Sequence, residues 1–181
     1  MLVPEENLGV VVLTNAEEGG AFDSILYHVL DHYFHLPATD WIAAFKAVKD
    51  KDEKDVAETM KKAASARDAN SKPSLPLEKY AGVYNDAWYG PITIRMENGG
   101  LVISFDHSPD MTGDLQHWQH DTFNAHWRVR TIEDAFITFS LNPDGSIDSA
   151  RMAAVSPLAD FSFDYQDLLL KPAVAQAAEK K

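Results

Sequence analysis

The 181-residue sequence predicts an α+β protein in which an N-terminal strand-plus-helices segment precedes a small antiparallel β-barrel. Two observations carry this fold class. Apolar residues recur with helical spacing up to about residue 63 and with strand-like alternation from Leu77 onward. Between the two patterns lies ASARDANSKPSLP (residues 64–76), which lacks periodicity and contains several Ser and Pro residues, as linkers do. We therefore expect two unlike parts joined by a linker.

The first expected element is a strand at residues 10–13. Four apolar residues stand in a row there, three of them β-branched, between Gly9 and Asn15. Such a run suits a strand that is covered on both faces in the middle of a sheet. Because only nine residues precede it, we expect the sheet around this strand to come from outside the chain.

Two amphipathic helices are expected next. Pro37 ends the first, and the second begins at Thr39 or Asp40, whose side chains can cap free N–H groups. The charged stretch KDKDEKD (residues 49–55) of the second helix is expected to face solvent. The first helix carries apolar residues on one side, here called the apolar arc: Phe22, Ile25, Leu26, Val29, Tyr33 and Leu36.

The second part is expected to consist of short strands. Residues 92–96 and 101–105 alternate in polarity on either side of Asn98 and Gly99, a pair typical of a tight hairpin turn. Strand-like stretches also occupy residues 115–123, 125–132, 135–141, 146–154 and 161–166. Roughly six to eight short strands indicate an antiparallel barrel or sandwich. The predicted boundaries are 1–36 for the strand and first helix, 37–75 for a helical connector and linker, 76–170 for the barrel, and 171–181 for a frayed tail.

Charge and composition argue against several classes of function. The net charge is −12 and neither part has a basic patch, so we expect no nucleic-acid partner and no binding to anionic membranes. The chain has no Cys, which excludes disulfides and thiolate metal sites. No apolar run reaches the ~18 residues of a membrane span, and the N-terminus lacks the pattern of a signal peptide.

Both parts resemble pieces of one known family. The stretch PEENLGVVVLTN, followed by an amphipathic helix, resembles the C-terminal end of the serine hydrolase domain shared by class C β-lactamases, penicillin-binding proteins and related esterases and peptidases. The second part resembles the lipocalin-like barrel of unknown function that often follows that domain. The matching segments of this barrel are LEKYAGVY (77–84), YGPITI (89–94), the Asn-Gly turn before LVISF, HWQHDTF (117–123), NPDGSI (142–147) and FSF (161–163).

The resemblance implies a location and a set of neighbours for these segments. It implies that the first strand lies in the sheet of a catalytic domain, that the first helix packs across that sheet, and that the protein is periplasmic or secreted. It also implies that the barrel packs beside the catalytic cleft, where it shapes substrate access, or that it mediates oligomerisation. The family's nucleophile stands in S-x-x-K, but this sequence contains no S-x-x-K, Y-x-N or K-T-G.

We therefore predict no catalytic residue and no cofactor in this chain. The predicted function is that of a non-catalytic accessory region of a serine hydrolase that cleaves amide or ester bonds. The alternative is a stand-alone barrel that binds a small ligand, whose candidate residues are Trp88, Tyr89, His117, Trp118, Phe123 and Trp127. An eight-stranded barrel is just wide enough to be filled by side chains or to hold one small ligand, and so many aromatic residues favour a filled interior.

Two histidine clusters are candidates for metal binding. His28, His32 and His35 stand at i, i+4 and i+7 of the first helix, a spacing that can bring imidazoles to one ion. Their place away from the apolar arc favours a solvated stripe instead. His117 and His120 would point to opposite faces of a strand, so we favour one half-buried His bonded to a backbone carbonyl or a carboxylate such as that of Asp121.

The uncovered apolar surface predicts a partner. Leaving the side chains of residues 10–13 in water would forgo about 1.5–3 kcal/mol each, and an open strand edge invites pairing with another chain. We expect residues 8–36 to meet either the missing catalytic domain or a second copy of this chain in a homo-oligomer.

Overall fold

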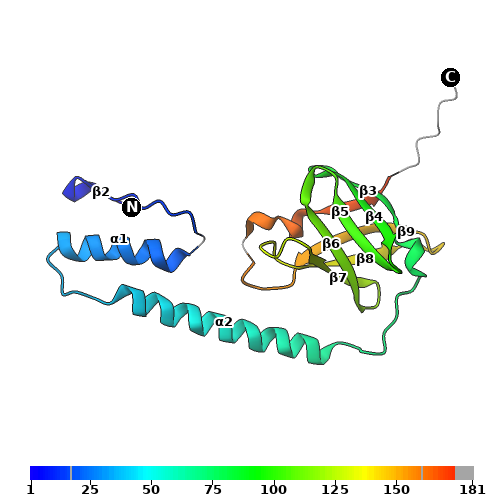
Figure 1. The fold of residues 1–181 in the computed structure, drawn as a ribbon, viewed down its shortest axis with the longest axis horizontal. Coiled ribbons are helices and arrows are strands. Elements are labelled where there is room, and N and C mark those ends of the chain that lie inside the picture. Colours follow the sequence, from blue (N-terminus) through cyan, green and yellow to red (C-terminus); the bar gives the residue numbers. More distant parts are fainter. Residues whose placement is uncertain (17, 160, 174–181) are drawn as a thin grey trace, which may run out of the picture. The chain divides into compact units, whose positions relative to one another are not determined.

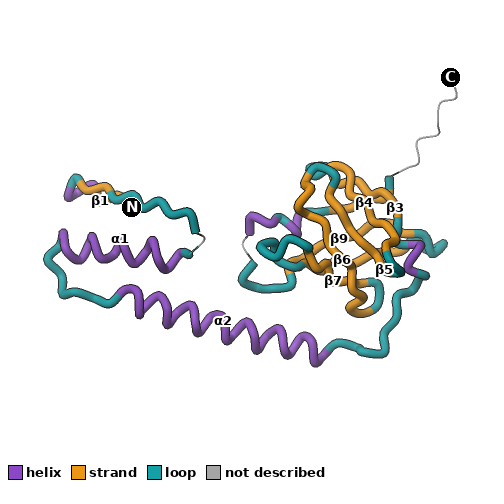
Figure 2. Tube along the Cα trace, viewed as in Figure 1, coloured by secondary structure: helices purple, strands orange, loops and turns teal. Residues whose placement is uncertain are grey.

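The computed structural model describes residues 1–16, 18–159 and 161–173. It divides the chain into two compact units, Met1–Lys61 and Lys62–Lys181 (Figure 1). The first unit is mostly helical and the second is mostly strands (Figure 2). This confirms the predicted α+β class with a small antiparallel barrel.

The barrel is a closed ring of eight antiparallel strands. Consecutive strands pair with one another, and the last strand closes the ring by pairing with both the first and the seventh strand of the series. The asparagine–glycine turn is present between β4 and β5, with φ of 51° at Asn98 and 81° at Gly99. The strands are β3 (Gly82–Asp86), β4 (Gly90–Glu97), β5 (Gly100–Phe105), β6 (Ser108–Gln119), β7 (Thr122–Trp127), β8 (Ala135–Leu141), β9 (Ile147–Ala154) and β10 (Leu169–Pro172).

Alternate residues of these strands fill the barrel. Ile92 and Ile94 of β4 and Ile103 of β5 are fully buried. Thr93 and Arg95, which alternate with the two isoleucines of β4, remain partly exposed. Large aromatic side chains complete the interior, where an eight-stranded barrel has little space left. The largest fully buried side chains are Trp127, Tyr80, Tyr165, Phe105 and Phe123.

The prediction of a strand at residues 161–166 was wrong. Two short 3₁₀ helices, η3 (Phe161–Phe163) and η4 (Tyr165–Asp167), stand there instead. Asp164 between them has a φ of 52°, a left-handed conformation that interrupts an extended chain. The closing strand is β10, which the sequence analysis split between barrel and tail; residues 174–181 of the expected tail lie outside the described residues.

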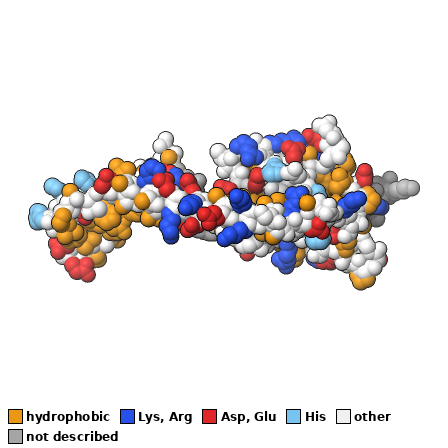
Figure 3. Space-filling view, turned by 90° about the horizontal axis from the view of Figure 1, so that it is seen from below, with side chains coloured by type: hydrophobic (Ala, Val, Ile, Leu, Met, Phe, Trp, Pro, Cys, Tyr) orange, Lys and Arg blue, Asp and Glu red, His pale blue; other side chains and the backbone are white. Residues whose placement is uncertain are grey.

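The N-terminal unit contains both expected helices. Helix α1 spans Gly19–Tyr33 and helix α2 spans Trp41–Ala66. Asp40 caps α2, because its Oδ1 accepts the backbone N–H of Ala43 at 2.9 Å. Residues 49–55 are exposed as expected, and positive and negative side chains gather along α2 in Figure 3. None of the described helices has an apolar stretch long enough to cross a membrane.

The expected strand at residues 10–13 is absent. The chain instead forms a two-stranded hairpin from β1 (Leu2–Val3) and β2 (Leu8–Gly9), and the apolar run follows it without strand pairing. Val11 and Leu13 are 80% and 90% exposed, whereas Val10 and Val12 are half-buried. Among the described residues, residues 11–13 form no backbone hydrogen bond. Val10 still pairs with Met1 through two hydrogen bonds, and the extended ladder stops there because no described segment offers a partner to residues 11–13.

Helices α1 and α2 pack through the side of α1 that lies opposite the apolar arc. Tyr27 stacks on Trp41 with ring centroids 4.8 Å apart, and the Trp41 indole Nε1–H donates to Asp31 at 2.7 Å. The buried residues of α1 are accordingly Ser24 and Asp31. The apolar arc stays largely uncovered, and Figure 3 shows hydrophobic side chains gathered on this unit.

Candidate functional site

The six candidate ligand-binding residues do not form one site. Phe123 and Trp127 are buried inside the barrel. Trp88 is 80% exposed and, with Tyr89, belongs to the turn between β3 and β4. His117 and Trp118 lie near the end of β6, where Trp118 packs on Phe136 with ring centroids 5.1 Å apart. The structure therefore divides the six residues among the barrel interior, the β3–β4 turn and the end of β6, where the His117 ring meets Phe123 edge-on with ring centroids 5.5 Å apart.

The histidines of the N-terminal unit are exposed and do not gather around one point. His28 and His32 lie on α1, and His35 follows the helix with a φ of 54°. Across residues 1–16, 18–159 and 161–173, no group of three or more His, Cys, Asp or Glu side chains has the arrangement of a metal site.

The second histidine cluster is held by hydrogen bonds within the protein. The ladder between β6 and β7 is irregular between His117 and Gln119, and His120 in the turn has a φ of 48°. Half-buried His117 uses its Nε2 to donate to the backbone carbonyl of His120 at 2.9 Å. The His120 side chain instead meets Ser71, with Nδ1 and Oγ 3.2 Å apart. The two imidazoles thus have different partners.

Asp121 is the centre of a polar cluster on the barrel. Its carboxylate accepts the backbone N–H and the hydroxyl of Ser74, both at 2.8 Å, and also accepts the hydroxyl of Tyr80. Partial burial opposes ionisation of Asp121, but the hydrogen bonds from Tyr80 and Ser74 outweigh it and lower the pKa of this carboxyl. Burial, followed by the bond to Asp121, raises the pKa of Tyr80. The pair is therefore a carboxylate and a neutral phenol at neutral pH.

This cluster extends along the whole turn. We use the name β6–β7 turn for residues 118–121, which are the last two residues of β6 and the two that follow it, and the name strap for residues 67–75. The Arg67 guanidinium lies 5.0 Å from the centre of the Trp118 ring, and the backbone N–H of Asp68 donates to Gln119 Oε1 at 3.2 Å. Residues that were predicted to form a linker are thus bonded to the barrel.

Asp86 is the centre of a second hydrogen-bonded site, which lies at the end of the barrel opposite the β6–β7 turn. Its Oδ1 accepts the backbone N–H groups of Trp88 and Tyr89 at 2.8 and 2.9 Å, and its Oδ2 accepts that of Leu169 at 2.9 Å. Burial opposes ionisation, yet these backbone donors prevail and lower the pKa of Asp86. Gly90, with a φ of 72°, completes the turn. Sequence reasoning missed Asp86, although an Asp four residues before a Gly signals a turn of this kind.

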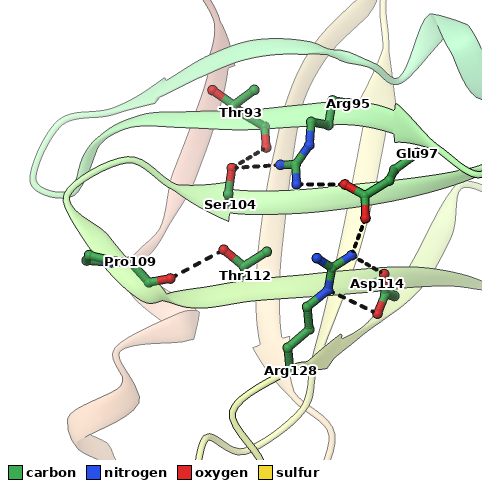
Figure 4. Close-up of polar contacts among 8 residues, drawn as sticks. All are labelled: Thr93, Arg95, Glu97, Ser104, Pro109, Thr112, Asp114 and Arg128. Carbon is green, nitrogen blue, oxygen red and sulfur yellow. Dashed lines mark hydrogen bonds and ion pairs between the residues drawn. The ribbon is translucent and has the colours of Figure 1, made fainter.

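The outer face of the barrel carries a network of arginines and carboxylates (Figure 4). Arg128 donates to Glu97 at 2.7 Å and to Asp114 at 2.9 Å, and Arg95 donates to Glu97 at 2.9 Å. Hydrogen bonds from Arg128 lower the pKa values of Glu97 and Asp114. Two cations balance two anions here, so the network links strands and leaves no net charge to attract an ionic ligand.

Comparison with known proteins places this barrel in a family. The family model described as "Domain of unknown function (DUF3471)" matches residues 66–172, which is more than half of the chain, and the chain belongs to this family. The crystal structure of the C-terminal domain of penicillin binding protein Rv0907 is similar, with 26% sequence identity and a TM-score of 0.42. That match covers 59% of this chain and 93% of the other. Comparison with curated proteins gives no match.

Proposed function

We propose that this chain is the non-catalytic accessory region of a β-lactamase-like serine hydrolase that cleaves amide or ester bonds. The DUF3471 membership of residues 66–172 supports an accessory role for the barrel. The resemblance of the N-terminal stretch to the end of a serine hydrolase domain, together with the absence of S-x-x-K, Y-x-N and K-T-G, supports a chain that depends on a catalytic partner.

The observation that carries this proposal is the surface of the N-terminal unit. Residues 11–13 offer backbone donors and acceptors that have no partner among the residues described. The neighbouring helix presents an apolar arc in which Phe22, Ile25 and Val29 are 37–51% exposed. A helical partner would cover the arc but leave the backbone groups unpaired. A sheet with a free edge supplies both a backbone ladder and an apolar face.

The energetic gain from such a partner is substantial. A fully buried aliphatic or aromatic side chain gains about 1.5–3 kcal/mol, so covering the half-exposed side chains of the arc contributes on the order of 1 kcal/mol each. Without the catalytic domain, a second copy of this chain offers the same extended run and the same arc. We therefore propose that the isolated chain forms a homo-oligomer through residues 8–36.

Sedimentation velocity over a range of concentrations tests this surface. Val29 on the arc and Val129 on the barrel are both 37% exposed, so Val29→Glu and Val129→Glu form a matched pair. We expect the wild type and Val129→Glu to associate and Val29→Glu to sediment as a monomer. A monomeric wild type, or equal association of both variants, would contradict the proposed interface.

The absence of catalysis is tested separately. The purified chain is incubated with a chromogenic β-lactam and an activated ester, and its intact mass is measured. We expect no turnover and no mass increase, because no Ser is followed three residues later by Lys. Turnover accompanied by an acylated serine would refute the accessory role, whatever the oligomeric state.

A small-ligand-binding barrel is the second candidate, and one observation favours it. The indole N–H of buried Trp127 has no acceptor within 3.5 Å among the described atoms and makes only a longer contact with the Tyr165 hydroxyl. A buried donor without a close partner costs roughly 1–3 kcal/mol. An apolar ligand with a carbonyl group would satisfy it. If such a ligand quenches the tryptophan fluorescence of the wild type but not that of Trp127→Phe, the result would support this function. If the fluorescence of the wild type does not change, the barrel interior is filled by its own side chains and binds no such ligand.

A further inference from the structure

We infer that the β6–β7 turn is a docking cradle for the strap, and that the strap is a releasable device in the N-terminal part of the barrel unit. The inference concerns residues within the barrel unit and does not depend on the proposed function. It assigns a role to the HWQHDTF segment, whose histidines and aspartate looked like candidate ligands in the sequence.

The strap and the turn meet residue by residue in the same chain order. Four consecutive turn residues, 118 to 121, each contact a different position of the strap, and those positions ascend with the turn. Trp118 contacts Arg67, Gln119 contacts Asp68, His120 contacts Ser71, and Asp121 contacts Ser74.

These contacts combine several kinds of interaction. A guanidinium over an indole contributes a cation–π attraction. The backbone N–H of His120 donates to the Ser71 hydroxyl at 2.5 Å, and the Asp121 carboxylate accepts two hydrogen bonds from Ser74. Charged acceptors make the stronger hydrogen bonds. A set of contacts this varied recognises one particular segment.

A side chain of the barrel core, Tyr80, is bonded to both the cradle and the strap. The hydroxyl of Tyr80 donates to Asp121 and accepts the backbone N–H of Leu75 at 3.2 Å, while the Tyr80 ring is fully buried against Phe123 and Phe139. The far end of the strap is therefore tied to the core through one side chain. The near end begins at Arg67, directly after the last residue of α2, and docking holds this residue against Trp118.

The extent of the family match agrees with this assignment. The match begins at residue 66 and so includes the strap, whereas the hydrophobic pattern alone placed the start of the barrel near residue 76. The bonds to residues 67–74 lie outside the strand ladders, so this part of the strap can detach while the ladders stay paired and Leu75 stays packed against the core. The device thus has a docked state and a released state on one intact barrel.

Proteolysis and hydrogen exchange test the inference on the full chain. Trypsin can cut after Arg67. The peptide amides of Asp68, Ser74 and Leu75 report docking, since they donate to Gln119, Asp121 and Tyr80 respectively. The test variants are Asp121→Ala and the double variant Ser71→Ala/Ser74→Ala. Ser156→Ala is the control, because Ser156 accepts a comparable hydrogen bond from Leu158 in another loop.

The double variant removes the hydroxyls of Ser71 and Ser74. Each lost hydrogen bond should change the equilibrium constant between the docked and the released strap by roughly fivefold. Cleavage tracks the open population when opening is fast, so we expect cutting at Arg67 and exchange of the three amides to accelerate by about twenty-fold. The control should stay within about twofold of the wild type. The barrel's circular dichroism should be unchanged in the double variant, which distinguishes strap release from unfolding if Asp121→Ala proves unstable.

Two results would overturn the inference. The first is a wild-type strap that trypsin cuts, and whose amides exchange, as fast as in an unfolded peptide. The second is equal protection in the double variant and in Ser156→Ala. Neither result bears on oligomerisation through residues 8–36, so the two proposals fail independently.

Discussion

Replacing Asp86 by Ala is expected to destabilise the barrel more than any change on its outer surface. The carboxylate is 8% exposed and accepts three backbone N–H groups, two in the β3–β4 turn and one from Leu169 at the start of β10. β10 closes the ring, so this side chain ties a turn to the closing strand. The variant deprives all three donors of their acceptor.

The size of the effect follows from those donors. A hydrogen bond to a charged group contributes about 1.5–3 kcal/mol, and a buried donor left unpaired loses about 1–3 kcal/mol. The N–H of Trp88 can turn to water because its residue is exposed, which leaves the N–H groups of Tyr89 and Leu169 as the main losses. We expect a loss of about 3–5 kcal/mol, a large part of the 5–15 kcal/mol typical of a domain.

Urea unfolding followed by tryptophan fluorescence measures this loss. With a slope near 1.5 kcal/mol per molar urea, the midpoint should fall by about 2–3 M. Asp110→Ala is the matched control, since Asp110 is exposed and its side chain has no hydrogen bond among the described residues. It should change the free energy of unfolding by less than ~0.5 kcal/mol. A loss below about 1 kcal/mol in Asp86→Ala would refute the reasoning.

The pH dependence provides a second check on Asp86. Its pKa is lowered in the folded state, because the backbone hydrogen bonds outweigh the burial that opposes ionisation. Its contribution is therefore present above the ordinary carboxyl pKa of about 4 and is lost as the pH falls through the lower folded value. Wild-type stability should drop over that acidic range, and the stability of Asp86→Ala should depend less on pH there.

Two further perturbations have clear expectations. A Cβ added at Gly113 would lie 2.9 Å from both the His126 carbonyl oxygen and a Trp127 ring carbon, so Gly113→Ala should cost about 1–3 kcal/mol in thermal or urea unfolding. Gly82→Ala, whose Cβ would be 3.9 Å from the Tyr84 ring, should be near neutral. Burial raises the pKa of Tyr84 to about 12, so stability should hold below pH ~10 and decline as the pH rises through about 12. Absorbance at alkaline pH should show a late phenolate step that shrinks in Tyr84→Phe; ionisation of the full complement near pH 10 would contradict this.

Most of the barrel could be predicted from the sequence because its signals are local. Alternation such as Ile92 and Ile94 gives the buried face of a strand, and Asn98 with Gly99 gives the tight turn. The closing strand was missed because its four residues are too few for alternation to show. The aromatic stretch after residue 160 has the composition of a strand, yet the left-handed Asp164 places Tyr165 in the core from a short helix.

Long-range arrangements could not be predicted in the same way. Periodicity located the apolar arc on α1, but it could not tell that Tyr27 and Asp31 on the other side would meet Trp41. The sequence indicated that the segment containing Asp121 was a candidate site. The residues that bond to this segment, Ser71 and Ser74, lie about fifty residues earlier in a stretch without any pattern. Their pairing depends on a turn whose shape comes from the finished barrel.

The position of β10 at the end of the ring has a consequence for biosynthesis. Seven of the eight barrel strands leave the ribosome before residues 169–172 do, and until then β3 and β9 each present an unpaired edge. A nascent or prematurely terminated chain that stops short of Leu169 is therefore an open sheet with two exposed borders, able to recruit other chains in place of its own last strand.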